Sequence, residues 1–348
     1  MAQYSMRDLA READVSQSTV SRALRNDPSI SEATRRRIQA LAAKRQYRFD
    51  PRITELMTSL RKGVQAPGQV IAWLDLQKQR DYWDVERHSQ PIWEGAARHA
   101  KQLGFQLERF RIADFPDSSR RLNSVLRARG IRAVILSGRC PSGLALDLDW
   151  EFYASVKFGF VPVSPGCDVV EDDGLGLVAR CLKEIATRGY RRIGFPFVRF
   201  AQRHDPHLAG EHAGAIAEFQ ASPESQDAKV SFTQLDWNRT SFEAFAKWFR
   251  EYRPDAILVN CRQALDWLRT LGEEPGKTVG VAHLYTDFQE LDDHWSGGVV
   301  HCRQIGETLV EQVTARFTQH AFGLPETPRM ILITPGWQDG ATLPQRRL

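Results

Sequence analysis

Short apolar runs alternate with amphipathic stretches from residue 69 to residue 333, and this alternation constrains the fold more than any other feature of the sequence. Runs of four or five apolar residues are typical of buried strands, whereas apolar residues spaced by three and four are typical of helices that cover a sheet. Such a chain folds as βαβ units with parallel strands and helices on both faces. We expect strands near residues 70–74, 106–110, 133–136, 156–160, 192–195, 256–259, 278–281 and 330–333. We expect helices at 91–103, 120–129, 174–188, 207–219, 241–252, 262–271 and 303–321.

This α/β region is too long for one compact sheet. The chain has 348 residues, of which 42% are hydrophobic and 26% charged, and such a composition is typical of globular proteins. Because domains of roughly 100–150 residues are the most common, the part beyond residue 68 predicts two lobes. The stretch from Gly63 to Gly68 is typical of a linker. We therefore expect a helical head over residues 1–49, a short helix and linker over 50–68, and a two-lobed α/β domain over 69–348.

Charge and cysteine usage favour a reducing compartment. Residues 1–8 carry Arg7 and Asp8 where a signal peptide needs an apolar core, and no stretch approaches the roughly 18 uncharged apolar residues that span a bilayer. The five cysteines are scattered and form no Cys-x-x-Cys pair, which disfavours a disulfide framework and a zinc site. We expect a cytoplasmic, nucleoid-associated protein without a membrane partner, a metal or a cofactor. The cysteines are Cys140, Cys167, Cys181, Cys261 and Cys302.

The basic excess of the chain lies in its first sixth. Residues 1–62 hold 13 Lys and Arg against 7 Asp and Glu, whereas the remainder holds 34 against 36. Apolar residues at helical spacing predict three short helices there, the second after an N-cap at Ser16 and the third after an N-cap at Ser31. A small helical unit with a basic face is typical of a nucleic-acid binder, because its cations neutralise phosphates and release counterions.

The second of these helices carries the side chains that a helix-turn-helix places in the major groove. Gln17 and Ser18 lie at its start, where side chains point at base edges. Arg22 lies one turn further along and can offer two donors to a guanine. A solvated helix face is the alternative interpretation of the same pattern.

Residues 5–61 closely resemble the head of the lactose/galactose repressor (LacI-type) family. The likeness rests on Val15-Ser-Gln-Ser-Thr-Val-Ser-Arg22, on Ile30-Ser-Glu-Ala-Thr-Arg35 and on Tyr47-Arg48 before a short helix. It implies a homodimeric bacterial transcription regulator, expected to be a repressor, that binds a near-palindromic operator in double-stranded DNA. By the same resemblance, three residues read bases and three lie near phosphates. The base-reading residues are Gln17, Ser18 and Arg22, and the phosphate neighbours are Ser16, Thr19 and Ser21.

A short hinge helix is expected after the head. Asp50 followed by Pro51 is a helix-start signal, and the residues after it include an apolar stripe at helical spacing. By the resemblance, Ile53 and Leu56 match the hinge positions that enter the minor groove, with Leu56 wedged into the central base step. Such wedges kink the duplex at a cost of a few kcal/mol, so folding of the hinge is coupled to DNA binding. A plain linker helix is the alternative.

The head departs from the family pattern at several positions. Asp14 replaces the usual glycine of the turn, and Asp is one of the residues that tolerate the left-handed conformation. The hinge proline is shifted to Pro51, and Glu55 near phosphates is unfavourable unless its side chain points outward. The bases that this head prefers therefore stay open.

Beyond the head, the chain resembles more weakly the two-lobed fold of periplasmic sugar-binding proteins, with parallel sheets in both lobes. In such proteins a small-molecule effector lies between the lobes, and here a sugar or sugar derivative is expected. Closure of the lobes moves the first lobes of a dimer against each other, so the α/β domain would serve effector binding and dimerisation.

Polar pocket positions of the family carry over only in part. Asp173 and Asn260 match them, whereas His207 stands where an Arg usually holds sugar hydroxyls and Cys261 replaces the Asp after the Asn. The late acidic pair of the family is replaced near Ala282-His283-Leu284. Further candidates for effector binding are Trp73, Asp75 and His301. Core packing is the alternative for Trp73, and an ordinary surface or core histidine is the alternative for His301.

Two other functions stay open. A pocket without its bidentate donor and its acid cannot grip a sugar in the usual way, so a ligand-independent DNA-binding regulator with a degenerate cleft is the first alternative. A solute-binding protein or an enzyme with an accessory head is the second. No Gly-x-Ser-x-Gly motif and no Cys/His arrangement suggests a nucleophile, and we predict that the chain is not an enzyme.

Overall fold

The computed structural model describes residues 6–24, 30–45, 69–76, 89–115, 119–137, 146–159, 166–199, 206–225, 227–236, 241–286 and 294–346. The chain divides into two compact units, Met1–Pro67 and Gly68–Leu348. The expected hinge helix, with Ile53 and Leu56, lies outside the described residues. Within the described part, no helix is both long enough and apolar enough to cross a membrane.

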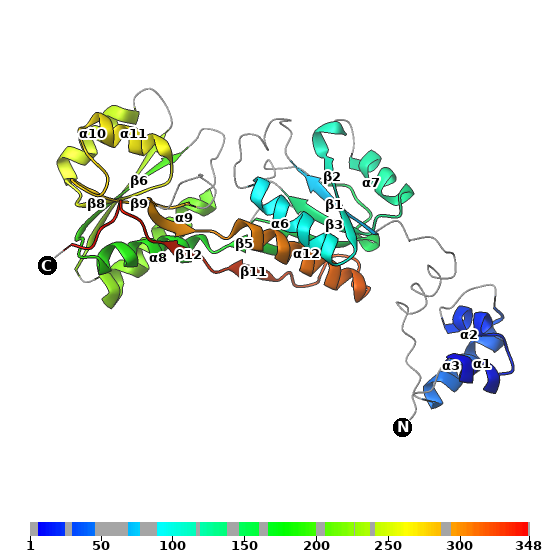
Figure 1. The fold of residues 1–348 in the computed structure, drawn as a ribbon. Coiled ribbons are helices and arrows are strands. Elements are labelled where there is room, and N and C mark those ends of the chain that lie inside the picture. The colour runs from blue at the N-terminus through cyan, green and yellow to red at the C-terminus, as the bar shows by residue number, and fades with distance from the viewer. Residues whose placement is uncertain are drawn as a thin grey trace. The chain divides into compact units, whose positions relative to one another are not determined.

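The first unit contains the short helices α1 (Met6–Glu12), α2 (Gln17–Leu24) and α3 (Glu32–Lys44), coloured blue in Figure 1. Helices of this length are marginal alone in water, so they depend on a shared core. Ser31 caps α3 by accepting a hydrogen bond from the Thr34 backbone N–H at 3.3 Å, as the sequence predicts. All three helices contribute buried residues to the core: Leu9, Ala10, Ala13, Val20, Ala23, Ile38 and Ala42.

The turn between α1 and α2 contains one left-handed residue. Asp14 has a φ of 52°, a conformation that costs Asp less than most residues. Its backbone N–H donates to the Arg11 carbonyl at 3.3 Å, and the Val15 N–H donates to the Ala10 carbonyl at 3.0 Å. The prediction that the turn survives without a glycine is confirmed.

The second unit begins with a lobe built on a six-stranded sheet of order β11-β5-β4-β3-β1-β2. Every neighbouring pair in it is parallel. The strands are β1 (Gln69–Asp75), β2 (Phe105–Arg111), β3 (Ala133–Ser137), β4 (Ala154–Phe158), β5 (Asp168–Asp172) and β11 (Met330–Ile333). The helices of this lobe are α6 (Ser89–Gln102), α7 (Ser119–Ala128) and α12 (Cys302–Thr318). Helices α6 and α12 approach closely because a glycine lies at their contact: a Cβ at Gly306 would lie 1.9 Å from the Ile92 carbonyl oxygen.

The other lobe is built on a second six-stranded sheet of order β12-β10-β9-β8-β6-β7. Only the pair of β10 and β12 is antiparallel, and the other neighbours are parallel. The strands are β6 (Arg192–Arg199), β7 (Lys229–Asp236), β8 (Ala256–Val259), β9 (Gly280–His283), β10 (Ser296–Val299) and β12 (Gly336–Gln338). The helices are α8 (Gly174–Thr187), α9 (Pro206–Ala221), α10 (Ser241–Tyr252) and α11 (Arg262–Thr270), and Figure 1 shows α10 and α11 together at one end of this lobe.

Three short crossovers join the described elements of the two lobes. They are Asp173 between β5 and α8, Val300 and His301 between β10 and α12, and Thr334 and Pro335 between β11 and β12. The Asp173 backbone N–H donates to the Ile333 carbonyl at 3.2 Å, and Arg180 donates to the Pro335 carbonyl at 3.5 Å. The first and third crossovers therefore lie side by side, and the predicted two-lobed α/β fold with parallel sheets is confirmed.

Four strands, β5, β7, β10 and β12, have no counterpart in the sequence prediction. The reason is clearest for β10, whose sequence Ser-Gly-Gly-Val has no apolar run. A Cβ at Gly297 would lie 2.0 Å from the His283 carbonyl oxygen of β9. This strand is thus selected by the close approach of its neighbour, and not by local propensity.

Candidate functional site

The start of α2 is capped by hydroxyl groups. The Ser16 Oγ accepts a hydrogen bond from the Thr19 backbone N–H at 3.1 Å, and the Ser16 and Thr19 hydroxyls lie 2.9 Å apart. Ser16 is exposed and Thr19 is half-buried. Hydroxyls at a helix N-terminus lie where the partial positive charge of the helix favours a phosphate.

The outward face of α2 presents polar side chains. Gln17 and Arg22 are exposed, while Val20 on the opposite face is completely buried. Ser18 and Ser21 lie on the same helix, and their side chains are not among those that the structure describes. The core thus holds one face of α2 and leaves the other to solvent.

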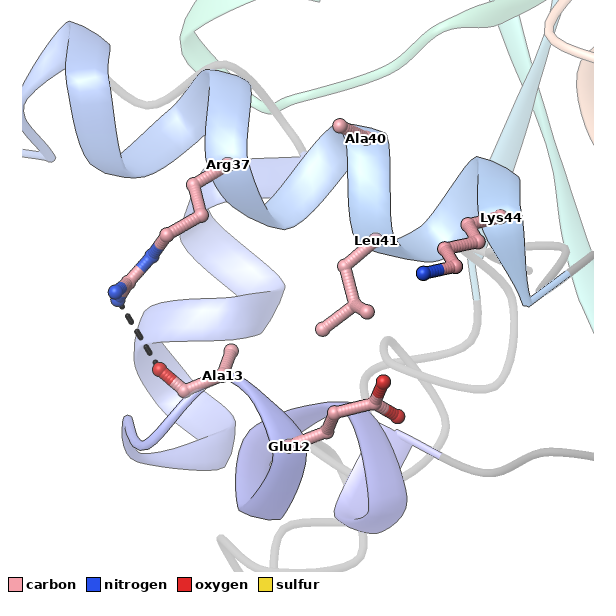
Figure 2. Close-up of a pocket in the computed structure, with 6 residues that line it drawn as sticks. All are labelled: Glu12, Ala13, Arg37, Ala40, Leu41 and Lys44. Carbon is pink, nitrogen blue, oxygen red and sulfur yellow. Dashed lines mark hydrogen bonds between the residues drawn. The ribbon is translucent and has the colours of Figure 1, made fainter.

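Helix α3 fixes the ends of the two helices that precede it. Arg37 donates to the Ala13 carbonyl at 3.1 Å, just past the end of α1 (Figure 2). Gln39 donates to the Ala23 carbonyl in the last turn of α2, also at 3.1 Å. Carbonyls at helix ends have no partner within the helix, so these two side chains supply it. Helix α2 is therefore held at its start by Ser16 and at its end by Gln39.

A small cavity of about 340 Å³ lies between α1 and α3. Figure 2 shows Leu41 and Ala13 inside it, with charged side chains at its edge. Close to it, Arg45 makes a two-pronged ion pair with Glu12, with the shortest contact at 2.6 Å. The lining residues are Glu12, Ala13, Arg37, Ala40, Leu41 and Lys44. None of them belongs to α2, so the cavity is separate from the polar face of that helix.

In the first lobe, the two effector candidates of β1 are engaged within the protein. Trp73 is 1% exposed and packs edge-on against Trp93, with ring centroids 5.5 Å apart. Asp75 is 3% exposed and forms an ion pair with Arg109 on β2. The charge of Asp75 is therefore balanced locally.

In the second lobe, Asn260 bridges two strands at their carboxyl ends. Its Oδ1 accepts from the Val198 N–H at 2.9 Å, and its Nδ2 donates to the Val198 carbonyl at 3.0 Å. Both ends of the amide are used in this pair, which ties the end of β8 to β6. The side chain is buried.

Two other candidates lie at the crossovers. Asp173 caps α8, since its Oδ1 accepts from the Gly176 N–H at 2.8 Å. His301 is exposed and left-handed, with a φ of 61°, at the start of α12. Its ring lies against Gly336, where a Cβ would be 2.7 Å from the His301 Nε2. His207 lies on α9, and its side chain is not among those described.

His283 at the end of β9 is a polar residue that sequence reasoning missed as a candidate. Its ring is completely buried, and its Nδ1 accepts from the Tyr285 backbone N–H at 3.1 Å. Burial lowers the pKa of His283 to about 3, so the ring is neutral at neutral pH. The only signal in the sequence was that the acidic pair of the family is replaced near Ala282-His283-Leu284. That replacement does not show that the His283 ring is buried.

The comparison with family models covers the helices described above. Residues 5–50 match the family of bacterial regulatory proteins, lacI family. The head of this chain is therefore of the lacI family. LacI-family proteins are DNA-binding transcription regulators and not enzymes, so the predictions of a regulator and of a non-enzymatic chain are confirmed.

Solved structures share the fold over most of this chain. A transcriptional regulator CelR–cellobiose complex is 16% identical, with a TM-score of 0.56, and the match covers 98% of this chain and 100% of that one. The lac repressor dimer bound to operator and the anti-inducer ONPF is 14% identical, with a TM-score of 0.51, over 99% and 100% of the two chains. A LacI-family regulator from Enterococcus faecium with bound ribose is 10% identical, with a TM-score of 0.56, over 80% and 100%. No curated protein matches the chain.

Proposed function

We propose that this lacI-family regulator is a homodimeric repressor that binds a near-palindromic operator in double-stranded DNA and responds to a small molecule related to carbohydrates. One observation carries the DNA-binding part: α2 exposes Gln17 and Arg22, while its buried face and both of its ends are fixed by the rest of the head. A helix held in this way can enter a major groove as a rigid body.

In this proposal the roles of the side chains are those that the family resemblance implies, and the placement of α2 supports them. Gln17, Ser18 and Arg22 read base edges, and a two-pronged Arg–guanine contact contributes about 1–3 kcal/mol of discrimination. Ser16, Thr19 and Ser21 lie near phosphates and set the register of the head on the duplex. Two copies of the head then bind half-sites about one helical turn apart.

The hinge completes the DNA complex in this proposal. Ile53 and Leu56 enter the minor groove at the centre of the operator, and Leu56 is the wedge between base pairs. The lac repressor, whose fold this chain shares, has been solved as a dimer bound to operator. Bending the duplex costs free energy, and this cost is offset only where the bent DNA makes further contacts with the protein. The wedge therefore favours the operator over random duplex.

Effector sensing belongs to the two-lobed unit. Proteins of the same fold have been solved with cellobiose and with ribose, which supports a small-molecule site in this chain. Its residues are drawn from Trp73, Asp75, Asp173, His207, Asn260 and His301. A ligand that binds one arrangement of the lobes more tightly than the other shifts the dimer between two states, and the three crossovers are where the lobes would move.

A ligand-independent regulator is the second candidate. It is favoured by one observation, the engagement of polar candidates within the protein: Asn260 uses both ends of its amide on Val198, and Asp75 is paired with Arg109. In this version the cleft has lost its effector, and the α/β unit only holds the dimer together.

Genomic footprinting tests the proposal. The full chain is used both as purified protein and in a cytoplasmic extract, and the DNA sites that it protects are mapped. We expect protected sites with dyad symmetry, and a preference over random duplex of at least about 10³-fold at physiological salt. A monomeric protein that binds random and genomic duplexes alike would contradict the proposal. A thermal-shift screen of sugars and sugar acids then separates the two candidates, because a ligand at 100 times its Kd adds about 2.7 kcal/mol of stability.

A further inference from the structure

The first turn of α11 lacks the strong acceptors that helix starts usually have. This helix begins after β8, and its N-cap is Cys261, whose thiol is only a weak acceptor for the backbone N–H groups of Gln263 and Ala264. No acidic residue lies in the first turn. The first N–H groups of a helix have no partner within the helix and together carry a partial positive charge. The start of α11 therefore offers donors and positive potential.

A cation adds to this positive potential. Arg262 is the first residue of α11 and is exposed, although cations are unfavourable at a helix N-terminus. Among the described residues no ion pair involves Arg262, whereas Arg269 in the last turn pairs with Asp266 at 3.0 Å. Cys261 cannot balance the charge, because burial raises the pKa of its thiol to about 11 and the thiol stays neutral.

His283 supplies an unpartnered donor beneath the same turn. It is the register partner of Val259 on β8. His283 and Val281 point to the same face of β9, because they are two residues apart in the strand. Val281 belongs to the same buried cluster as Ala264 and Leu265 of α11, so the His283 ring lies on the face that α11 covers. Burial, and also the charge of Arg262, disfavour the protonated ring.

The tautomer of His283 follows from its hydrogen bond. Because Nδ1 accepts from the Tyr285 N–H, the proton of the neutral ring is on Nε2. The Nε2 atom is buried and has no hydrogen-bond partner in the described part of the chain. A buried donor without a partner costs about 1–3 kcal/mol, and such departures from local rules concentrate at functional sites.

We propose that the start of α11, with Arg262 and His283, binds the anionic group of the small-molecule effector, a carboxylate or a phosphate. The proposal rests on the effector sensing proposed above and adds the chemical class of the ligand. An anion accepts hydrogen bonds from Nε2–H and from the first N–H groups of α11, and it balances the charge of Arg262. A neutral sugar offers no such charge. The carboxyl edge of a parallel sheet, where His283 lies, is also where ligands of α/β proteins usually bind.

The test uses the simplest anions as probes. Thermal unfolding of the full chain is followed while inorganic phosphate or acetate replaces chloride at constant ionic strength. We expect a saturable rise of the α/β transition by about 3 °C near ten times the Kd. The Arg22→Ala variant serves as the background, since the head can also bind phosphate. The relative Kd of phosphate and acetate tells the two anion classes apart.

The matched variants lie at the two ends of the same helix. Arg262→Gln should weaken anion binding about tenfold or more, whereas Arg269→Gln should leave it unchanged. His283→Gln keeps a donor close to the position of Nε2 and should retain binding, whereas His283→Leu should lose it. If His283→Leu does not fold, the comparison of Arg262→Gln with Arg269→Gln tests the anion site by itself.

Several results would overturn the proposal. One is a thermal unfolding midpoint that is no higher in phosphate or acetate than in chloride. Another is an equal loss of anion binding in Arg262→Gln and Arg269→Gln. A third is stabilisation by D-galactose that matches or exceeds that by D-galacturonate and D-galactose 1-phosphate. In each case operator binding, measured with the same α/β variants in the chain that retains Arg22, shows whether the proposed function survives. Specific binding that a neutral sugar modulates keeps the regulator and removes only the anion.

Discussion

The head and the α/β unit treat their polar candidate residues in opposite ways. In the head, Gln17 and Arg22 are exposed, and the opposite side of the helix packs into a small apolar core. In the α/β unit, Asp75 and Asn260 are buried and are satisfied by groups of the protein itself. A contact surface for DNA is thus a property of one helix face, whereas a ligand site in a two-lobed fold depends on which buried groups the tertiary structure leaves without partners.

This difference predicts which measurements respond to a substitution. A change on the exposed face of α2 affects binding and leaves the free energy of unfolding nearly unchanged, because surface substitutions usually stay within about 0.5 kcal/mol. A change at a buried polar group of the α/β unit affects stability first. Substitutions in the two regions should therefore separate an effect on binding from an effect on stability.

Arg22→Ala should remove about 1–3 kcal/mol of base discrimination at each half-site, which is a large loss over two half-sites. Competition gel shifts with operator and random duplex measure it, with thermal unfolding in parallel. Arg36→Ala is the matched control, since Arg36 is exposed on α3 and pairs with Glu32. Unchanged operator preference in Arg22→Ala would remove the base-reading role.

Acidification should destabilise the α/β unit through His212. Its ring is buried against Phe195, Phe197 and Phe232, and burial lowers its pKa from 6.5 to about 4. Between these two values the unfolded chain binds a proton that the folded chain does not, so stability falls as the pH falls through this window and is constant above it.

The His212→Leu variant isolates that effect from the titration of carboxylates. The difference in unfolding free energy between variant and wild type should shift by about 3 kcal/mol in favour of the variant from pH 7 to pH 4. Denaturant unfolding at a series of pH values measures it. Parallel pH profiles of the two proteins would show that His212 is not the titrating group.

Asn260→Ala should destabilise the α/β unit by about 2–3 kcal/mol, because it leaves the buried N–H and carbonyl of Val198 without their side-chain partner. The exposed amide Gln304 gives the control, since Gln304→Ala should change the unfolding free energy by less than about 0.5 kcal/mol. If Asn260→Ala is as stable as the wild type, Asn260 is again a candidate for contact with an effector. The difference between exposed polar residues in the head and engaged ones in the α/β unit would then be smaller.

The smallest effect is expected in the head. Gln39→Ala removes the donor to the Ala23 carbonyl and should lower the stability of the head by about 1 kcal/mol. Gln39→Lys, which keeps a donor, should restore most of it, and Gln39→Glu should not. Hydrogen exchange of the α2 amides in the full chain reports the loss. Equal exchange in all four proteins would mean that Gln39 does not hold α2.

The head and the α/β unit also differ in how much of their structure can be predicted from the sequence. In the head, the caps at Ser16 and Ser31 and the left-handed Asp14 follow from signals within a few residues, and the structure contains them. In the α/β unit, the alternation of strands and helices predicted both lobes, but the Ser-Gly-Gly-Val sequence of β10 gave no signal, since that strand depends on contact with β9.

The helical head, the parallel α/β lobes and the polar face of α2 can be predicted from the amino-acid sequence, because capping, apolar spacing and side-chain chemistry act over short stretches of chain. Which polar groups are engaged within the protein depends on the packing of distant segments. Asn260 meets Val198 across 62 positions, and the His283 ring lies beneath a helix from another part of the chain. Such partners are set by packing between distant segments, so no local pattern distinguishes a satisfied buried group from one that awaits a ligand.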